Sequence, residues 1–381
     1  MYSRSSFRPT TIASITALVL IVWLLYPVDL HPLTSHAHPA PDYAAALARA
    51  RARQALDSSE VNPVCRTQLF THRKRSTRSI VLLHGFTNCP AQFVPLGRQF
   101  FDAGANVYIP RYPHHGLADR LTPDIANLTA EELATATDEA LDIAAGLGEK
   151  VTVMGISSGA VAAAWAAGLR GDIDRAVVVA PAFGMPQIPG PLAELATKAA
   201  LRLPNFFIWW DLDLKAAAPG PKHAYPRFAT RALAQVVRLG MAAREQARHA
   251  PLAARSVVFV SNAVDPAVRN ELAAALAADW RASAGNEGAS ASIERAPESD
   301  SRTSARDGGA SAAARDMSAI DAAGLPAAPE SSTRSLSGGS IQEYSFPANL
   351  GLIHDVIDTE QVKQRTDLVY PVLTKLAWGD D

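Results

Sequence analysis

A serine between two glycines is the clearest sign of chemistry in this sequence. The motif Gly-Ile-Ser-Ser-Gly at 155–159 follows an apolar run at 151–153 and precedes an alanine-rich run at 160–165. This order predicts a strand, a sharp turn carrying Ser157, and a helix. Such a turn needs small neighbours because its backbone is strained and crowded. The unpaired N–H groups at the helix start could stabilise an oxyanion. The alternative is an ordinary strand-to-helix turn without a catalytic role.

A second motif, His-Gly-Phe-Thr at 84–87, comes directly after the apolar run at 80–83. With the serine motif, it resembles the α/β-hydrolase superfamily, and within it the carboxylesterases and the monoacylglycerol-lipase-like enzymes. The resemblance covers most of residues 61–280 and 340–378. It implies that the N–H groups of Phe86 and Ser158 form an oxyanion hole and that His84 is structural.

A serine hydroxyl is a poor nucleophile, so a basic histidine and an orienting carboxylate are expected as well. In this superfamily they follow the serine in the order acid, then histidine. Asp265 lies in the loop after the apolar run at 256–261, and His354 follows the last expected strand. The resemblance therefore implies a catalytic triad of Ser157, Asp265 and His354.

Other residues compete for these two roles. His114 and His115 lie in a loop that borders the pocket in the family, but they precede the serine in the chain and are expected to shape the site. Asp211 and Asp213 lie in the expected lid, and Asp355 is adjacent to the proposed histidine, so its side chain is expected to point elsewhere.

Apolar runs alternate with helical periodicity along the chain, which predicts an α/β fold: a mostly parallel central sheet flanked by helices. The near-continuous apolar runs are typical of strands buried on both faces. Strands are expected at 79–83, 106–110, 151–155, 176–180, 256–261 and 340–346. Helices are expected at 43–57, 92–103, 129–146, 158–169, 227–248, 266–280 and 359–378.

Two segments interrupt the alternation. Residues 182–250 combine prolines, an aromatic cluster at 206–210 and a helical stretch, which we interpret as a helical lid over the sheet. Residues 281–340 are rich in Ala, Ser, Gly and charged residues and have few large apolar side chains. They cannot bury enough surface to offset the entropy of ordering, so a disordered insertion is expected. The hydrolase domain is then expected to span 61–378.

The amino terminus predicts export. Residues 10–28 carry no charge and follow Arg4 and Arg8, which is typical of a membrane segment with a cytoplasmic N-terminus. Residues 1–28 are therefore expected to act as a membrane anchor. The alternative is a cleaved signal peptide, with a small-x-small site at 35–37. Residues 29–60 are expected to form a linker and a short helix. The catalytic domain would lie outside the cytoplasm, periplasmic or extracellular, or be secreted.

The composition excludes several classes of protein. The formal charge of −1, from 36 basic and 37 acidic residues, provides no field to attract nucleic acid. The two cysteines, Cys65 and Cys89, are too few for a disulfide scaffold and wrongly spaced for zinc. One bridge between them is compatible with an oxidising compartment, and the alternative is two buried free thiols. No cofactor and no metal is expected. The sequence does not indicate an oligomeric state.

The expected function is hydrolysis of carboxylic esters with apolar groups through an acyl-enzyme, with a small-molecule ester or lipid as substrate. Two alternatives remain open. One is a catalytically inactive domain that binds an envelope lipid or protein. The other is thioesterase, amidase or peptidase activity with the same triad.

Overall fold

The structure is a computed structural model that describes residues 9–31, 33–188, 190–211, 220–294 and 339–379. Its centre is a seven-stranded sheet in the order β1-β3-β2-β4-β5-β8-β9, in which only the β1–β3 pair is antiparallel. The strands are β1 (Gln68–Phe70), β2 (Ser76–Leu83), β3 (Asn106–Ile109), β4 (Gly148–Ile156), β5 (Arg175–Val179), β8 (Ser256–Asn262) and β9 (Ser340–Phe346).

The register of the sheet aligns the strand ends that carry the site. Val81, Val153, Ala176, Val257 and Ile341 are partners in a single row across five strands. These strands run parallel, so the loops after β2, β4, β8 and β9 leave the sheet at one edge. All six strands predicted from apolar runs are present, while the short edge strand β1 was missed.

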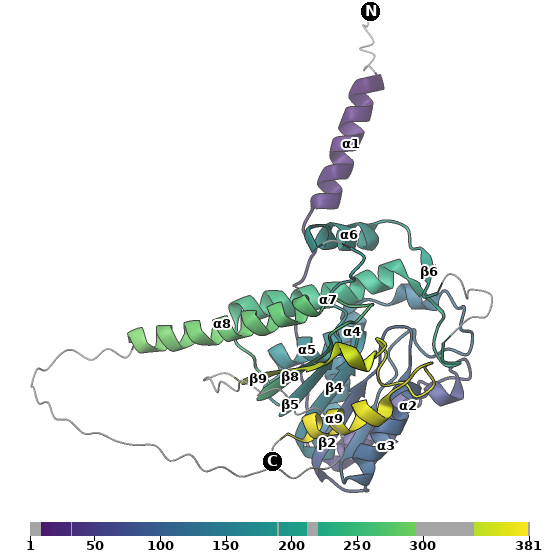
Figure 1. Ribbon diagram of the computed structural model, residues 1–381, viewed down its shortest axis with the longest axis vertical. Coiled ribbons are helices and arrows are strands. Elements are labelled where there is room, and N and C mark those ends of the chain that lie inside the picture. Colours follow the sequence, from purple (N-terminus) through teal and green to yellow (C-terminus); the bar gives the residue numbers. More distant parts are fainter. Residues whose placement is uncertain (1–8, 32, 189, 212–219, 295–338, 380–381) are drawn as a thin grey trace, which may run out of the picture.

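Helices cover both faces of the sheet (Figure 1). Helices α3 and α9 contact strands on one face, and α4 and α5 contact β2, β4 and β5 on the other. Helix α7 packs on α5, and α8 packs on α7. Their bounds are α2 (Tyr43–Gln54), α3 (Val94–Asp102), α4 (Ala130–Leu147), α5 (Ser158–Leu169), α7 (Thr230–His249), α8 (Asn270–Glu294) and α9 (Thr366–Trp378), with short 3₁₀ turns at Pro63–Cys65, Pro90–Phe93, Asp124–Asn127 and Ala348–Leu350.

Local sequence explains where helix α4 begins. Thr129 accepts a hydrogen bond from the N–H of Glu132, and the Glu132 carboxylate accepts one from the N–H of Thr129. This reciprocal capping box satisfies two N–H groups that would otherwise lack partners.

The segment at 29–60, expected to form a linker and a short helix, packs on the body. Leu33 and Ala40 are buried, and the indole N–H of Trp165 donates to the Leu33 carbonyl. The backbone N–H groups of His36 and His38 donate to the carboxylates of Asp138 and Asp142 on α4, respectively. The domain therefore begins near residue 29. The short helix expected at 43–57 is present as α2.

The same two carboxylates surround a buried arginine. Arg170 has a fully buried side chain and pairs with Asp138, Asp142 and Asp172 at 3.1, 2.8 and 2.6 Å. Burial opposes the charge of Arg170, but the hydrogen bonds and charges of Asp172 and Asp142 outweigh it and raise the pKa of Arg170. This cluster joins the amino-terminal segment to helices α4 and α5.

The segment interpreted as a lid has two parts of different character. Helix α6 (Gly190–Arg202) and the antiparallel pair β6 (Phe207–Trp209) and β7 (Arg227–Ala229) lie beyond the ends of the sheet. Helix α7 instead buries Val236, Leu239 and Ala243 and packs on α5. Helix α7 therefore belongs to the helical layer that covers the sheet.

Helix α8 continues beyond the residue at which disorder was expected to begin. It was expected to end at Trp280 and instead extends to Glu294. Ser283 and Ala284 are buried, and the Ser283 hydroxyl donates to the Ala247 carbonyl on α7. Alanine-rich sequence favours helix, and packing on α7 stabilises this extension. The rest of the expected insertion, residues 295–338, lies outside the described residues.

The helix nearest the amino terminus is α1 (Pro9–Leu25), which projects from the body next to α6 (Figure 1). No helix in the described part of the chain is both long enough and apolar enough to cross a membrane.

Candidate active site

Ser157 lies at a strained turn between β4 and α5, as its motif predicts. Its φ of 55° and ψ of −112° are unusual for a residue with a side chain. A Cβ on Gly155 would overlap the carbonyl of Gly159, and one on Gly159 would overlap the carbonyl of Leu83. The Ser157 N–H donates to the Val179 carbonyl at 3.0 Å, which fixes the turn to β5.

The loop after β2 supplies backbone donors next to this turn. Phe86 lines the same pocket as Ser157, and Ser158 is the first residue of α5. Among the described residues, no protein group accepts a hydrogen bond from the N–H of Phe86 or of Ser158. Both N–H groups are thus free to bind an oxygen that gains negative charge.

His354 and Asp265 form an ion pair at the carboxyl ends of β9 and β8. Nδ1 of His354 lies 2.9 Å from Oδ2 and 3.1 Å from Oδ1 of Asp265. The Asp265 side chain is fully buried and also accepts hydrogen bonds from the N–H groups of Ala267 and Val268. These donors fix the carboxylate, which in turn orients the imidazole.

The pair changes the acid-base behaviour of the imidazole. Burial alone would lower the pKa of His354, but the hydrogen bond and charge of Asp265, together with the charge of Asp355, raise this pKa above its ordinary value. The Asp265 contact engages Nδ1, so Nε2 is left to act on another group.

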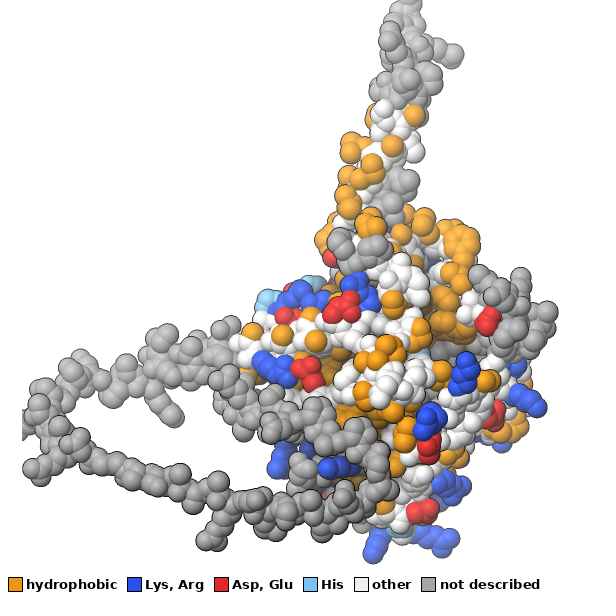
Figure 2. Space-filling view, viewed as in Figure 1, with side chains coloured by type: hydrophobic (Ala, Val, Ile, Leu, Met, Phe, Trp, Pro, Cys, Tyr) orange, Lys and Arg blue, Asp and Glu red, His pale blue; other side chains and the backbone are white. Residues whose placement is uncertain are grey.

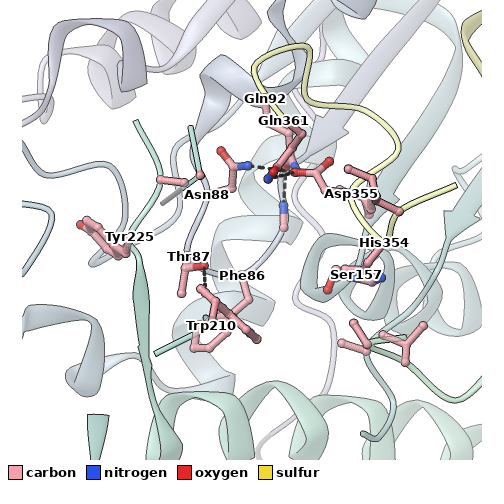
Figure 3. Close-up of a pocket in the computed structure, with 18 of the residues that line it drawn as sticks. Phe86, Thr87, Asn88, Gln92, Ser157, Trp210, Tyr225, His354, Asp355 and Gln361 are labelled. Carbon is pink, nitrogen blue, oxygen red and sulfur yellow. Dashed lines mark hydrogen bonds between the residues drawn. The ribbon is translucent and has the colours of Figure 1, made fainter. Parts of the chain in front are cut away.

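Ser157 and His354 line one pocket of about 420 Å³, and their side chains lie next to each other in Figure 3. The size is typical of a site for a small molecule. Most of the lining is apolar and comes from both the sheet edge and the segment 182–237, including Phe86, Ala182, Met185, Trp210, Leu233 and Val237.

The competing residues are engaged elsewhere. The buried ring of His84 contacts the Gly85 carbonyl and accepts from the Tyr112 N–H, and burial lowers the pKa of His84 to about 4. His114 contacts Asp124 and Glu132, and His115 contacts the Pro113 carbonyl.

Nδ1 of His354 contacts Asp265 rather than the adjacent Asp355. Asp211 lines the pocket, and Asp213 lies outside the described residues. Asp355 turns away from the imidazole and accepts a hydrogen bond from Gln92 instead.

Comparison with known families identifies the chain. The profile described as "Alpha/beta hydrolase family" matches residues 80–298, more than half of the sequence. The chain belongs to the alpha/beta hydrolase family. This assignment confirms the fold class and the family resemblance that the two glycine motifs suggested, and it makes this protein a hydrolase.

Solved structures similar to this hydrolase include three lipolytic proteins. Its similarity to a structure from a study of the metagenome-derived lipolytic enzymes LipS and LipT is 19% identity with a TM-score of 0.45, covering 58% of this chain and 84% of that one. A monoacylglycerol lipase from Paleococcus ferrophilus is 20% identical with a TM-score of 0.43, and the match covers 56% of this chain and 83% of that one. A soluble variant of monoglyceride lipase from Saccharomyces cerevisiae is 14% identical with a TM-score of 0.43, and the match covers 56% of this chain and 78% of that one. At these scores the likeness says nothing about substrate. No curated protein matches the chain.

The structure of this hydrolase brings together all five residues that the sequence singled out: Ser157, Asp265, His354, Phe86 and Ser158. Their catalytic roles remain predictions. Among the described residues, no group of three or more His, Cys, Asp or Glu side chains could hold a metal ion.

Sequence reasoning missed a polar group at one side of the pocket of this hydrolase. Asn88, Gln92 and Asp358 are buried, and together with the half-buried Asp355 they form a hydrogen-bonded group next to the loop at 84–87. Burial, followed by the negative charge of Asp358, raises the pKa of Asp355. Gln92 and Asp355 are 263 positions apart, so no local pattern links them.

Cys65 and Cys89 form a disulfide, with their Cα atoms 5.3 Å apart. The bridge was one of the two states that the sequence left open. It joins the loop at 84–89 to the turn before β1.

Proposed function

We propose that this protein is a serine hydrolase that cleaves carboxylic esters through an acyl-enzyme. One observation carries the proposal: the imidazole of His354 is oriented by buried Asp265 and lines the same pocket as Ser157. A histidine held in this way is the usual base for a serine nucleophile.

In the proposed reaction, Oγ of Ser157 attacks the ester carbonyl carbon while Nε2 of His354 takes the hydroxyl proton. The carbonyl oxygen becomes an oxyanion and receives hydrogen bonds from the N–H groups of Phe86 and Ser158. When the intermediate collapses, the alcohol leaves with the proton from His354, and the acyl group stays on Ser157. Water, deprotonated by His354, then attacks the acyl-enzyme and releases the acid.

We propose that the substrate carries apolar groups and that residues 182–229 act as its lid. The apolar lining of the pocket supports the first part. Trp210 supports the second, because it lines the pocket and its indole N–H donates to the Thr87 hydroxyl at 2.9 Å, next to Phe86 (Figure 3).

An apolar surface next to this lid supports a lipid as substrate. Large exposed apolar side chains gather on α1, on α6 and around β6, where Figure 2 shows them at the end of the body from which α1 projects. They include Leu18, Val22 and Leu25 of α1, Leu192 and Leu195 of α6, and Phe206, Ile208 and Trp210 around β6. An exposed apolar patch of this kind is typical of contact with membrane or protein.

We further propose that the amino-terminal segment exports the catalytic domain and retains it at the membrane. The uncharged run of α1 and the Cys65–Cys89 bridge support an oxidising compartment outside the cytoplasm. Cleavage at 35–37 would remove the packed Leu33, so retention is the better proposal. Fractionation of cells, followed by determination of the mature amino terminus, tests it. Recovery of the whole chain in the cytosol would contradict it.

The decisive experiment combines a fluorophosphonate probe with a panel of p-nitrophenyl esters, thioesters and amides. A protein that lacks residues 1–28 should be labelled and should cleave esters, and Ser157→Ala should abolish both. Ser261→Ala, on β8 outside the pocket, is the matched control and should retain both.

Each alternative has its own outcome in this experiment. A folded protein without labelling would favour a domain that only binds a lipid or a partner. Turnover confined to thioesters or amides would move the proposal to those classes. Ester cleavage that survives Ser157→Ala would refute it.

A further inference from the structure

A line of hydrogen bonds joins the loop after β2 to the loop that carries His354. The Gln92 side chain, which is 2% exposed, connects the two. Its Oε1 accepts from the N–H of Gly85 at 2.7 Å, and its Nε2 donates to Oδ2 of Asp355 at 2.9 Å (Figure 3). Gly85 precedes Phe86, and Asp355 follows His354, so Gln92 spans the two halves of the site.

The chemistry of the partners fixes the orientation of this amide. The N–H of Gly85 can only donate, and the Asp355 carboxylate, when ionised, can only accept. The carboxylate is itself fixed, because its Oδ1 accepts from the N–H groups of Ile357 and Asp358 at 3.2 and 3.1 Å. Reversing the Gln92 amide would place a donor against a donor and an acceptor against an acceptor.

A second contact runs beside the first. Nδ2 of Asn88 lies 3.0 Å from Oδ2 of Asp358 and 3.3 Å from Oδ2 of Asp355. Oδ2 of Asp358 also pairs with Nε2 of His223 at 2.8 Å, and both side chains are buried. Residues 85–92 are therefore held to residues 355–358 at two points.

The loop at 85–88 requires such support. Thr87 has a φ of 65°, a left-handed conformation that is strained for a β-branched residue. The direction of the Phe86 N–H depends on the peptide between Gly85 and Phe86. Gln92 binds the N–H of Gly85, which belongs to the peptide immediately before this one. A donor displaced by about 1 Å can lower a rate about 100-fold.

From this geometry we infer that Gln92 and Asp355 are positioning residues that hold the Phe86 N–H in register with His354. The inference rests on the proposed function, since it assumes that the Phe86 N–H stabilises the oxyanion. It gives Asp355, which is half-buried and follows His354, a role at the oxyanion loop, whereas Asp265 orients the imidazole. The base and the oxyanion donor are then oriented by one connected set of bonds.

Two single substitutions and their combination test this inference. In Gln92→Glu, the new carboxylate still accepts from Gly85 but faces the Asp355 carboxylate. In Asp355→Asn, the new amide presents N–H to the N–H of Gln92. Each single variant should lower kcat about 10- to 100-fold and change KM less than about threefold, because the loss concerns the transition state.

The double variant should recover activity. With both substitutions, the amide at 355 donates to the carboxylate at 92, whose other oxygen accepts from Gly85, so the line of hydrogen bonds re-forms with reversed polarity. We expect kcat to return to within about fivefold of the wild type, a strong coupling in a double-mutant cycle. A residue that only supports stability would show no such recovery of kcat at a temperature where all variants are folded. Gln99→Glu, which adds the same charge at an exposed position of α3, is the control and should leave kcat unchanged.

Two outcomes would overturn the inference: single variants with wild-type kcat, or a double variant at or below the product of the singles. If a single variant does not fold, the double variant still decides, since it should fold and turn over ester. Failure of the proposed function is separate, because it would appear as ester turnover in Ser157→Ala.

Discussion

Replacing Arg170 by methionine tests whether its carboxylate cluster joins the amino-terminal segment to the body. The substitution keeps most of the side-chain volume and removes the guanidinium. Asp138 and Asp142, whose side chains are 7% and 8% exposed, would then lose their cation. The side chain of Asp172 is 34% exposed, so losing the ion pair between Asp172 and Arg170 should cost less than about 1 kcal/mol.

The magnitude follows from what the two buried carboxylates retain. Removing one partner of a buried ion pair typically costs about 3–5 kcal/mol. Asp138 keeps the hydroxyl of Ser35 and the N–H of His36, and Asp142 keeps the N–H of His38. These donors place the expected loss near the lower end, about 3 kcal/mol.

Urea denaturation followed by tryptophan fluorescence measures this loss, and hydrogen exchange of residues 33–42 reports whether the segment detaches. Arg53→Met is the matched control, because Arg53 and Glu139 are 32% and 44% exposed and their pair should contribute less than about 1 kcal/mol. A loss for Arg170→Met no greater than for Arg53→Met, or unchanged exchange at 33–42, would refute the reasoning.

Three further predictions concern the site and its frame. Asp265→Asn should lower kcat about 10³- to 10⁴-fold. It should also move the acid limb of kcat/KM to lower pH, because the carboxylate raises the pKa of His354 above about 6.5 and the base must be neutral to act; an unmoved limb in the pH profile would contradict this. Gly159→Ala should abolish fluorophosphonate labelling, because its Cβ overlaps the Leu83 carbonyl, whereas Gly171→Ala, whose Cβ would meet the Ala253 carbonyl at an ordinary contact distance of 3.7 Å, should label normally; normal labelling of both would be inconsistent with a strained turn. Replacing Cys65 and Cys89 by serine should lower the free energy of unfolding by about 3 kcal/mol, seen as a lower urea midpoint; an equal midpoint would show that the bridge does not stabilise the domain.

The sequence predicted those elements whose signals are local. The apolar runs predicted every long strand of the sheet, and the motif at 155–159 predicted both the turn and helix α5 with its observed limits. Chain order within the family then placed Asp265 and His354, although their contact at 2.9 Å spans 89 positions. A distance of this kind has no signature in sequence alone.

Two of the errors, at residues 29–42 and in helix α8, share a physical cause, which is stabilisation by distant partners. Residues 29–42 resemble a linker because their proline and histidine content suggests no regular element, yet Asp138 and Asp142 bind their backbone from about 100 positions away. Strands β6 and β7 were missed because three-residue strands have too few positions to show alternation. Helix α8 was predicted too short because its polar end packs on α7, a contact that composition does not reveal.

If α1 is held in a bilayer, as proposed, the packed amino-terminal segment would limit where this hydrolase acts. Only eight positions separate the end of α1 at Leu25 from the buried Leu33, a length of at most about 28 Å when fully extended. Arg202 shortens the reach further by binding the carbonyls of Tyr26 and Pro27. With α1 held in a bilayer, the catalytic body could diffuse laterally but not away from the surface. Its substrates would then be those that partition into, or arrive within, a thin layer next to the lipid headgroups.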